Sequence, residues 1–188
     1  MKLTLLKSDH DIIEDFEEIE DLKARCFQSK VSELNLMTVK TNNIAAIVSR
    51  PELFSIIFLS QKEDLSNYNV ISITEPFQDK SNDSLDINCN ALLQLEFTDI
   101  RKEVSTAFLK EHKNEISMIS KEQIEDIILF IKKNSDKPFI INCDAGISRS
   151  AAIGIILEKI IGNKKNVELI ENFKRYSPNR ILLKKFDI

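Results

Sequence analysis

Apolar residues follow two patterns along this chain, a helical spacing and short continuous runs. Residues 11–28 carry apolar side chains at three- and four-residue steps beside a run of acidic positions, which predicts an amphipathic helix with a solvated face. Short runs rich in Ile, Val and Phe, bounded by polar or turn-forming residues, are typical of strands. The predicted strands are residues 34–39, 55–59, 70–74, 92–97 and 139–142.

Helical patterns dominate the second half of the chain. Ser120 and Gln123 have the spacing of a capping box, which predicts that a helix begins there. Residues 150–161 are apolar nearly all round and predict a buried central helix. We expect further helices at residues 167–176 and from residue 179 or 180 to the end.

Strands that alternate with helices predict an α/β domain with a mainly parallel central sheet flanked by helices. In such sheets ligands bind at the carboxyl ends of the strands. No internal repeat or abrupt change of composition marks a second domain. We therefore expect one main domain over residues 46–188, preceded by an extension of a helix plus a strand over residues 1–45, with a soft boundary between them.

The composition is that of a soluble globular protein, with 43% hydrophobic and 30% charged residues. A net charge of −4 gives no general attraction to nucleic acid or to an anionic membrane. The longest apolar run, residues 151–157, is far shorter than a membrane span, and charge interrupts the N-terminus too early for a secretory signal. We expect a cytoplasmic protein with no nucleic-acid or membrane partner.

Three cysteines, Cys26, Cys89 and Cys143, lie at wide and unrelated spacings, and the chain has only two histidines. This set predicts neither a disulfide framework nor a structural zinc site. Cysteines on apolar strands are usually packing residues, which is the interpretation for Cys26 and Cys89. No metal or organic cofactor is expected.

Cys143 differs because it begins a loop between a predicted strand and the buried helix. The loop reads Cys-Asp-Ala-Gly-Ile-Ser-Arg and ends at Arg149. Backbone N–H groups of such a loop and of the following helix N-terminus can surround an anion, and their positive field favours a thiolate. The planar guanidinium of Arg149 can hold two oxygens of a phosphoryl group. The pattern predicts a phosphate-binding loop with a cysteine nucleophile.

The other residues of this loop have predicted roles of their own. Gly146 lets the loop bend without a side chain filling the space that the phosphate needs. The hydroxyl of Ser150 can hydrogen-bond the sulfur and help it leave from a covalent intermediate. The predicted phosphate-binding residues are Asp144, Ala145, Gly146, Ile147, Ser148 and Arg149.

Cys-x5-Arg-Ser between an apolar strand and an apolar helix resembles the signature of the cysteine-dependent protein tyrosine and dual-specificity phosphatases. Residues 143–150 also resemble the small bacterial and phage members of that superfamily. The resemblance extends from about residue 47 to the C-terminus and is strongest at residues 139–161. It implies a phosphatase-like domain that hydrolyses phosphotyrosine in a protein or peptide through a phosphocysteine on Cys143. Phosphoserine and phosphothreonine are left open as further substrates.

The resemblance also implies an acid that protonates the leaving oxygen. Our candidate is Asp99, because residues 95–100 resemble the segment that carries the acid in the small bacterial members and precede the Cys143 strand in the required order. Three other aspartates in a polar loop remain alternatives for this role: Asp79, Asp83 and Asp86. Pro178 and Asn179 resemble a family segment that forms a structural turn beside the site.

One residue departs from the family pattern. Asn142 stands where the family usually has a histidine that helps keep the sulfur ionised. This departure supports a second hypothesis, a pseudophosphatase that binds phosphate without turnover. A third, in which the loop only caps a helix, is disfavoured by the intact Cys143, Arg149 and Ser150. Polyphosphorylated lipid headgroups are disfavoured as substrates, because the loop carries Asp144 and no basic residue between its ends.

Overall fold

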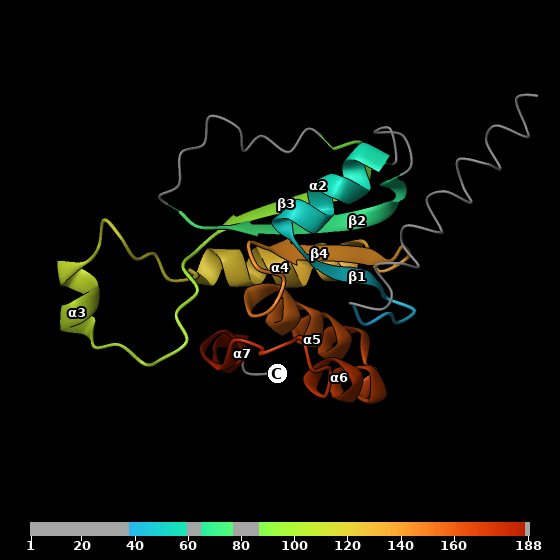
Figure 1. Cartoon of the computed structure of the whole chain (residues 1–188). Helices are drawn as coiled ribbons and strands as arrows, with labels where there is room; N and C mark the ends of the chain where they lie inside the picture. The colour runs from blue at the N-terminus through green and yellow to red at the C-terminus, as the bar shows by residue number, and fades with distance from the viewer. Residues whose placement is uncertain (1–37, 60–64, 77–86, 187–188) are drawn as a thin grey trace, which may run out of the picture.

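The computed structural model describes residues 38–59, 65–76 and 87–186. They form a β-sheet with helices on both faces (Figure 1). The predicted helix at residues 11–28 lies outside the described residues. Of the predicted strand at residues 34–39, only Thr38 and Val39 are described, and neither belongs to a strand.

The sheet has four described strands in the order β1-β4-β2-β3, and every neighbouring pair is parallel. These strands are β1 (Ile44–Ser49), β2 (Leu65–Thr74), β3 (Cys89–Glu96) and β4 (Phe139–Cys143). Every residue of β4 is buried, as a central strand with both faces covered requires. The predicted α/β class with a parallel central sheet is confirmed.

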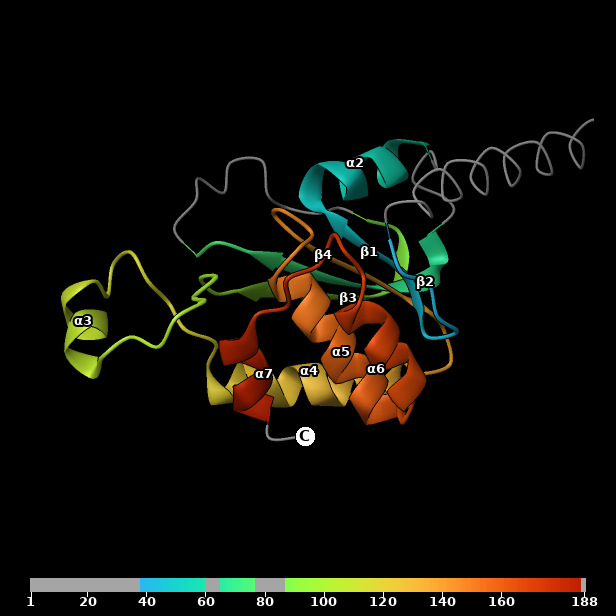
Figure 2. The same cartoon turned by 60° about the horizontal axis from the view of Figure 1, so that its bottom comes forward.

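Helices cover the two faces of the sheet unequally, as Figures 1 and 2 show. The described helices are α2 (Arg50–Leu59), α3 (Thr106–Glu111), α4 (Lys121–Lys133), α5 (Arg149–Ile161), α6 (Lys164–Glu171) and α7 (Arg180–Phe186). The cluster of buried side chains on one face includes residues of α4, α5, α6 and α7, whereas the cluster on the other face is closed by α2. No helix in the described part of the chain has the length and apolar character of a membrane span.

Strand alternation divides the core between these faces. Successive side chains of a strand point to opposite faces of the sheet. Ile141 and Cys143 therefore join the cluster beneath α5, and Ile140 joins the cluster beneath α2. Asn142 lies on the α2 face by the same alternation.

Most elements of the second half agree with their sequence patterns. The predicted runs at residues 70–74, 92–97 and 139–142 fall in β2, β3 and β4, with Phe97 one residue beyond β3. The capping box is present, because the Ser120 hydroxyl accepts from Gln123 N at 3.2 Å and the Gln123 side chain accepts from Ser120 N at 3.0 Å. Helices α5 and α7 begin within one residue of the predicted starts.

The predicted strand at residues 55–59 is wrong, because this run belongs to α2. Leu53 and Ile56 are buried while Phe54 and Phe58 are exposed, which is helical and not alternating spacing. Pro51 fits the first turn of a helix, where its missing N–H costs no hydrogen bond. A run this short could not be assigned from its apolar character alone.

Strand β1 and helix α3 were not predicted, and the bounds of α6 differ from the predicted helix at residues 167–176. Two alanines among the six residues of β1 weaken its strand pattern. Helix α6 begins at Lys164, because the Asn163 side chain caps it by accepting from Asn166 N at 3.2 Å. It ends at Glu171, and the chain then turns toward the loop that follows β4.

A buried carboxylate in the last turn of α5 connects three segments. Glu158 has 0% exposure and accepts hydrogen bonds from Thr41 Oγ1 at 2.5 Å, Asn43 Nδ2 at 3.0 Å and Asn166 Nδ2 at 3.0 Å. Thr41 and Asn43 precede β1, and Asn166 lies in α6. Glu158 thereby fixes α5, which begins at the candidate site, against both neighbours.

We predict that Glu158→Ala lowers the free energy of unfolding by about 3 kcal/mol, because the buried donor of Asn166 and the partly buried donors of Thr41 and Asn43 lose their acceptor. Urea denaturation measures the change. The control is Glu168→Ala at an exposed position of α6, which should change stability by less than about 0.5 kcal/mol. Equal effects of the two substitutions would contradict the structural role of Glu158.

Candidate active site

The candidate site lies where β4 ends and α5 begins. Cys143 is the last residue of β4 and Arg149 the first of α5, so residues 144–148 form the loop predicted from the sequence. Cys143 is 2% exposed, and its Sγ lies 3.2 Å from Ser150 Oγ. The loop is at the carboxyl edge of the sheet, where parallel α/β folds bind ligands.

Three carbonyl groups of this loop accept hydrogen bonds from distant segments. Asp144 O accepts from Arg50 N at 3.2 Å, Ile147 O from Ser177 N at 3.1 Å and Ser148 O from Asn179 N at 3.2 Å. These bonds fix the loop backbone from α2 on one side and from the chain before α7 on the other.

The backbone N–H groups of the same loop are available to bind a ligand. Within the described ranges, no protein acceptor receives a hydrogen bond from the backbone N–H groups of Ala145, Gly146, Ile147 or Ser148. A loop whose carbonyls are bound and whose N–H groups have no protein acceptor has the backbone chemistry of an anion-binding site. The predicted phosphate-binding residues therefore supply donors from their main chain.

Arg149 is 3% exposed and spans the ends of β2 and β3. Its Nη1 donates to Phe97 O at 2.7 Å and Thr74 O at 3.3 Å. Its Nη2 contacts Asp144 Oδ2 at 2.6 Å and Glu75 Oε1 at 2.9 Å. Its Nε is buried and donates to no acceptor among the described residues. Because a buried donor without an acceptor is rare in proteins, Nε is the position where an anionic oxygen fits best.

Asp144 bridges two guanidinium groups. Its Oδ2 contacts Arg149, and its Oδ1 lies 3.2 Å from Nε of Arg50, the first residue of α2. The Asp144 side chain is 32% exposed, against 14% for Arg50 and 4% for Arg149, so the carboxylate is the outermost of the three groups. Arg50 was not predicted as a site residue, because its helix was interpreted as a strand.

Asp99 follows β3 and joins the loop through its side chain. Its Oδ1 accepts from Ser148 Oγ and from Asn179 Nδ2, both at 2.7 Å, and its Oδ2 accepts from Arg101 Nε at 3.1 Å. Burial raises the pKa of Asp99, but these hydrogen bonds and the charge of Arg101 outweigh burial, so its pKa lies below the ordinary value. Asp99 is therefore ionised near neutral pH in this arrangement.

Asn179 connects this carboxylate with the C-terminal helix. Besides its bonds to Asp99 and Ser148, its Nδ2 donates to Ile100 O at 3.0 Å and its Oδ1 accepts from Leu182 N at 2.8 Å. It is 4% exposed. The segment before α7 lies beside the loop, where the sequence predicted a turn.

Asn142 is fully buried on the face of the sheet opposite Cys143. Neither its Oδ1 nor its Nδ2 has a hydrogen-bond partner within the described part of the chain, and the same holds for the hydroxyl of Ser72, its register partner on β2. The side-chain amide of Asn142 thus lies on the α2 face of the sheet and not within the loop.

A second cation near Cys143 was missed by sequence reasoning. Arg175 Nη2 lies 2.5 Å from Glu52 Oε2, which also accepts from Ser49 N at 2.6 Å. Ser49 is the register partner of Cys143 on β1. The hydrogen bond to Glu52 raises the pKa of Arg175 despite burial, and the charge of Cys143 contributes in the same direction. No sequence signal indicated this pair, because the strand and helix that bring it together were not predicted.

Gly146 has a φ of +67°, in the left-handed region that favours glycine. A Cβ at this position would lie 2.3 Å from Ser49 N and 2.5 Å from Val48 C. The backbone of β1 is thus among the nearest atoms that exclude a side chain here, a second reason for glycine besides the predicted space for the phosphate.

We predict that Gly146→Ala lowers the free energy of unfolding by at least about 2 kcal/mol, because the methyl group collides with the backbone of β1. Gly162→Ala is the matched control, since Gly162 also has a positive φ, +93°, but a Cβ there meets nothing within 4 Å. The control should cost about 1 kcal/mol in a thermal or urea titration. Equal losses would mean that backbone conformation alone, and not the approach of β1, requires the glycine.

The remaining candidates lie apart from this arrangement. The alternative acids Asp79, Asp83 and Asp86, together with Cys26, lie outside the described residues. Cys89 is partly buried at the start of β3, and burial raises the pKa of its thiol. Within the described ranges, no three His, Cys, Asp or Glu side chains are grouped so that they could hold a metal ion.

Comparisons with known proteins found similarity among solved structures and none by sequence. The chain matches no protein-family model and no curated protein sequence. Similar solved structures include a mouse protein assigned as a dual specificity phosphatase and complexed with zinc tungstate, with 14% identity, a TM-score of 0.37, and coverage of 64% of this chain and 70% of that one. A human tyrosine phosphatase-like serine/threonine/tyrosine-interacting protein has 17% identity, a TM-score of 0.39, and coverage of 74% and 83%.

Both names agree with the class that the loop resembles. Neither protein is bacterial or from a phage, so the relation to those small members stays a prediction. At these identities and TM-scores the function must be argued from the residues of the site itself.

Proposed function

We propose that this protein is a phosphoric monoester hydrolase that removes phosphate from phosphotyrosine in proteins or peptides through a phosphocysteine on Cys143. One observation carries the proposal: a buried cysteine begins a loop whose N–H groups have no acceptor among the residues that the structure describes, and the buried Nε of Arg149 lacks one there too. These donors match the oxygens of a phosphoryl group. Phosphoserine and phosphothreonine remain further candidate substrates.

The first step transfers the phosphoryl group to sulfur. The Cys143 thiolate attacks phosphorus, an S–P bond forms, and the bond from phosphorus to the ester oxygen breaks. Arg149 and the loop N–H groups bind the non-bridging oxygens during this transfer. Arg149 Nη2 can contact the substrate only after it exchanges the Asp144 carboxylate for a phosphoryl oxygen.

The second step releases phosphate. Water attacks phosphorus, the S–P bond breaks and the thiolate forms again. Ser150 Oγ, 3.2 Å from the sulfur, donates a hydrogen bond that stabilises the negative charge returning to Cys143. No metal is needed for either step.

Asp99 remains our candidate for the acid that protonates the leaving oxygen. Its pKa is low while Ser148, Asn179 and Arg101 donate to it. A substrate dianion bound in the loop would raise this pKa, because a like charge nearby disfavours the ionised carboxylate. We propose that Asp99 takes up its proton when the substrate binds and gives it to the departing oxygen.

We predict that Asp99→Asn reduces kcat about 10²-fold for an aryl phosphate with a poor leaving group and less than tenfold for one with a good leaving group. The asymmetry follows because only a poor leaving group needs the proton. The measurement is metal-free hydrolysis of phenyl and nitrophenyl phosphates from pH 5 to 8. An equal reduction for both substrates would make Asp99 a positioning residue and not the acid.

Cys143→Ser provides the control for the reaction as a whole, because a hydroxyl at this position is a far weaker nucleophile than a thiolate. It should abolish turnover of both aryl phosphates while leaving the fold intact by circular dichroism. Turnover that survives in folded Cys143→Ser would reject the proposed phosphatase mechanism.

We predict that Asp144→Asn tightens the binding of vanadate or inorganic phosphate by about tenfold, because it removes a negative charge that competes for Arg149. Competition against aryl phosphate hydrolysis measures the inhibition constant. Asp136→Asn, at an exposed position after α4, is the control and should change nothing. Weaker binding in Asp144→Asn would mean that Asp144 orients Arg149 for the anion instead of competing with it.

The second candidate function is a phosphate-binding module without turnover. The observation that favours it is the ion pair of Asp144 with Arg149, together with an Asp99 that is ionised before substrate arrives. Wild-type protein that binds vanadate but hydrolyses neither aryl phosphate would support this candidate over the phosphatase.

A further inference from the structure

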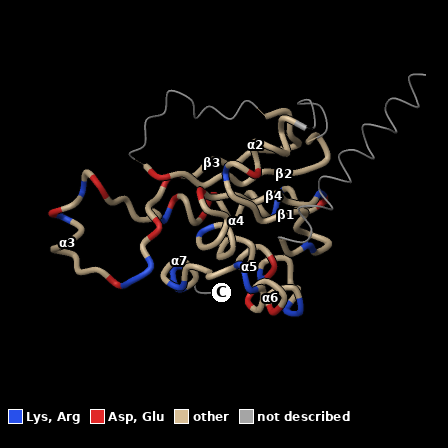
Figure 3. Tube along the Cα trace, viewed as in Figure 1, with Lys and Arg blue, Asp and Glu red and all other residues tan. Residues whose placement is uncertain are grey.

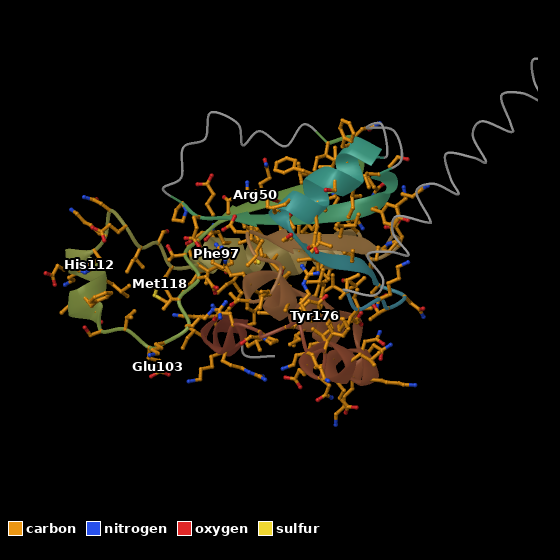
Figure 4. The ribbon with its side chains drawn as sticks, viewed as in Figure 1. Arg50, Phe97, Glu103, His112, Met118 and Tyr176 are labelled. Atoms are coloured by element: carbon orange, nitrogen blue, oxygen red, sulfur yellow. The ribbon has the colours of Figure 1, made fainter. Side chains whose placement is uncertain are left out.

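Residues 99–119, here called the arm, extend from the body of the domain. They carry α3, which has no buried residue and lies away from the sheet and the other helices in both views (Figures 1 and 2). In Figure 4, Met118 and Glu103 lie between α3 and the body. A short helix that buries none of its residues against the described segments is poorly explained by the stability of the fold alone.

Two adjoining cavities lie between the arm and α7. The outer one, with a volume of about 360 Å³, is lined on the arm side by Lys102 and Leu109 and on the α7 side by Lys184. The inner one reaches Phe97 and Asn179. Both are lined by Met118, Ile181 and Lys185, so they form one groove with an apolar floor.

This groove begins at the wall of the candidate active site. Asn179 lines its inner end and also donates to Asp99 and to the loop carbonyl of Ser148. Phe97 lines the same end, and its carbonyl accepts from Arg149. The inner cavity is small, about 20 Å³, and Phe97 and Asn179 are buried, so these two side chains form a wall between the loop and the outer cavity and contact both.

The groove is positively charged, although the protein as a whole is acidic. Lys102, Lys184 and Lys185 line it and are exposed, against one lining carboxylate, Glu103. Figure 3 shows basic residues on both the arm and α7. Glu103 lies 2.7 Å from Lys184, but their side chains are 77% and 68% exposed. Such an exposed pair is weak and can exchange partners.

We infer that this groove binds the acidic residues that flank the phosphorylated residue of a protein substrate, with an apolar side chain of the same segment on Met118 and Ile181. The inference rests on the proposed function, because it places the substrate's phosphate in the loop. Charge complementarity selects the partner: three lysines around an apolar floor favour an extended acidic segment. The groove thereby determines specificity without taking part in the chemistry.

The test uses phosphotyrosine peptides that differ only in their flanking residues, either acidic or neutral. Their dissociation constants are measured by fluorescence anisotropy with full-length Cys143→Ser protein, so that no turnover occurs during the titration. The same background then carries Lys102→Gln, Lys184→Gln and Lys185→Gln together. The matched control replaces three exposed lysines of α4 on the body of the domain: Lys121, Lys132 and Lys133.

We expect the acidic peptide to bind about tenfold more tightly than the neutral one, and this preference to disappear in the groove variant but not in the α4 control. Aryl phosphate hydrolysis by the groove variant with Cys143 intact should stay at the wild-type rate. Equal binding of both peptides, or an equal loss in the α4 control, would overturn the inference. A second copy of this chain as the occupant would also overturn it, and would appear as a dimer that dissociates in the groove variant.

The experiments distinguish failure of the proposed function from failure of the groove inference. Absence of aryl phosphate turnover in the wild type would reject the phosphatase. A lysine-dependent preference for the acidic peptide would still support the groove as a recognition surface. Turnover without any peptide preference would reject the groove and leave the phosphatase in place.

Discussion

The loop after β4 depends on three backbone hydrogen bonds that its carbonyl groups receive from outside. Arg50 N at the start of α2 binds Asp144 O, while Ser177 N and Asn179 N bind Ile147 O and Ser148 O. These three carbonyls are held, while the N–H groups of Ala145 to Ser148 have no acceptor among the described residues and can serve an anion. The first residue of α2 and the segment before α7 are therefore as necessary to the site as the loop itself.

Charge balance is the second constraint on this site. Arg149 is paired with Glu75 and Asp144, and Arg175 is paired with Glu52. The buried Arg149 and the partly buried Arg175 thus each have a carboxylate partner, which avoids the cost of an unpaired charge. A phosphate dianion that binds Arg149 Nη2 must therefore replace a carboxylate there. The ion pairs that stabilise the unliganded fold thus compete with phosphate for the same group.

The sequence predicted those parts of the site that are local in the chain. Cys143, Arg149 and Ser150 share one loop and one helix start, and Asp99 follows a strand whose apolar run was clear. Arg50 and Arg175 could not be predicted, because each reaches the site only through tertiary packing. The run at residues 55–59 was interpreted as a strand, since five apolar-rich residues fit either period. Strand β1 was missed because its two alanines weaken the strand pattern.

The measurement that tests the central claim most directly is the chemical identification of a covalent intermediate. Wild-type protein is mixed with excess aryl phosphate, quenched in acid within the first turnover, and analysed by intact mass and peptide mapping. We predict a mass gain of one phosphoryl group on the peptide that contains Cys143 and no gain in Cys143→Ser. Release of phosphate by the wild type with the phosphoryl group on another residue, or with the same mass gain in Cys143→Ser, would contradict the assignment of Cys143 as the nucleophile.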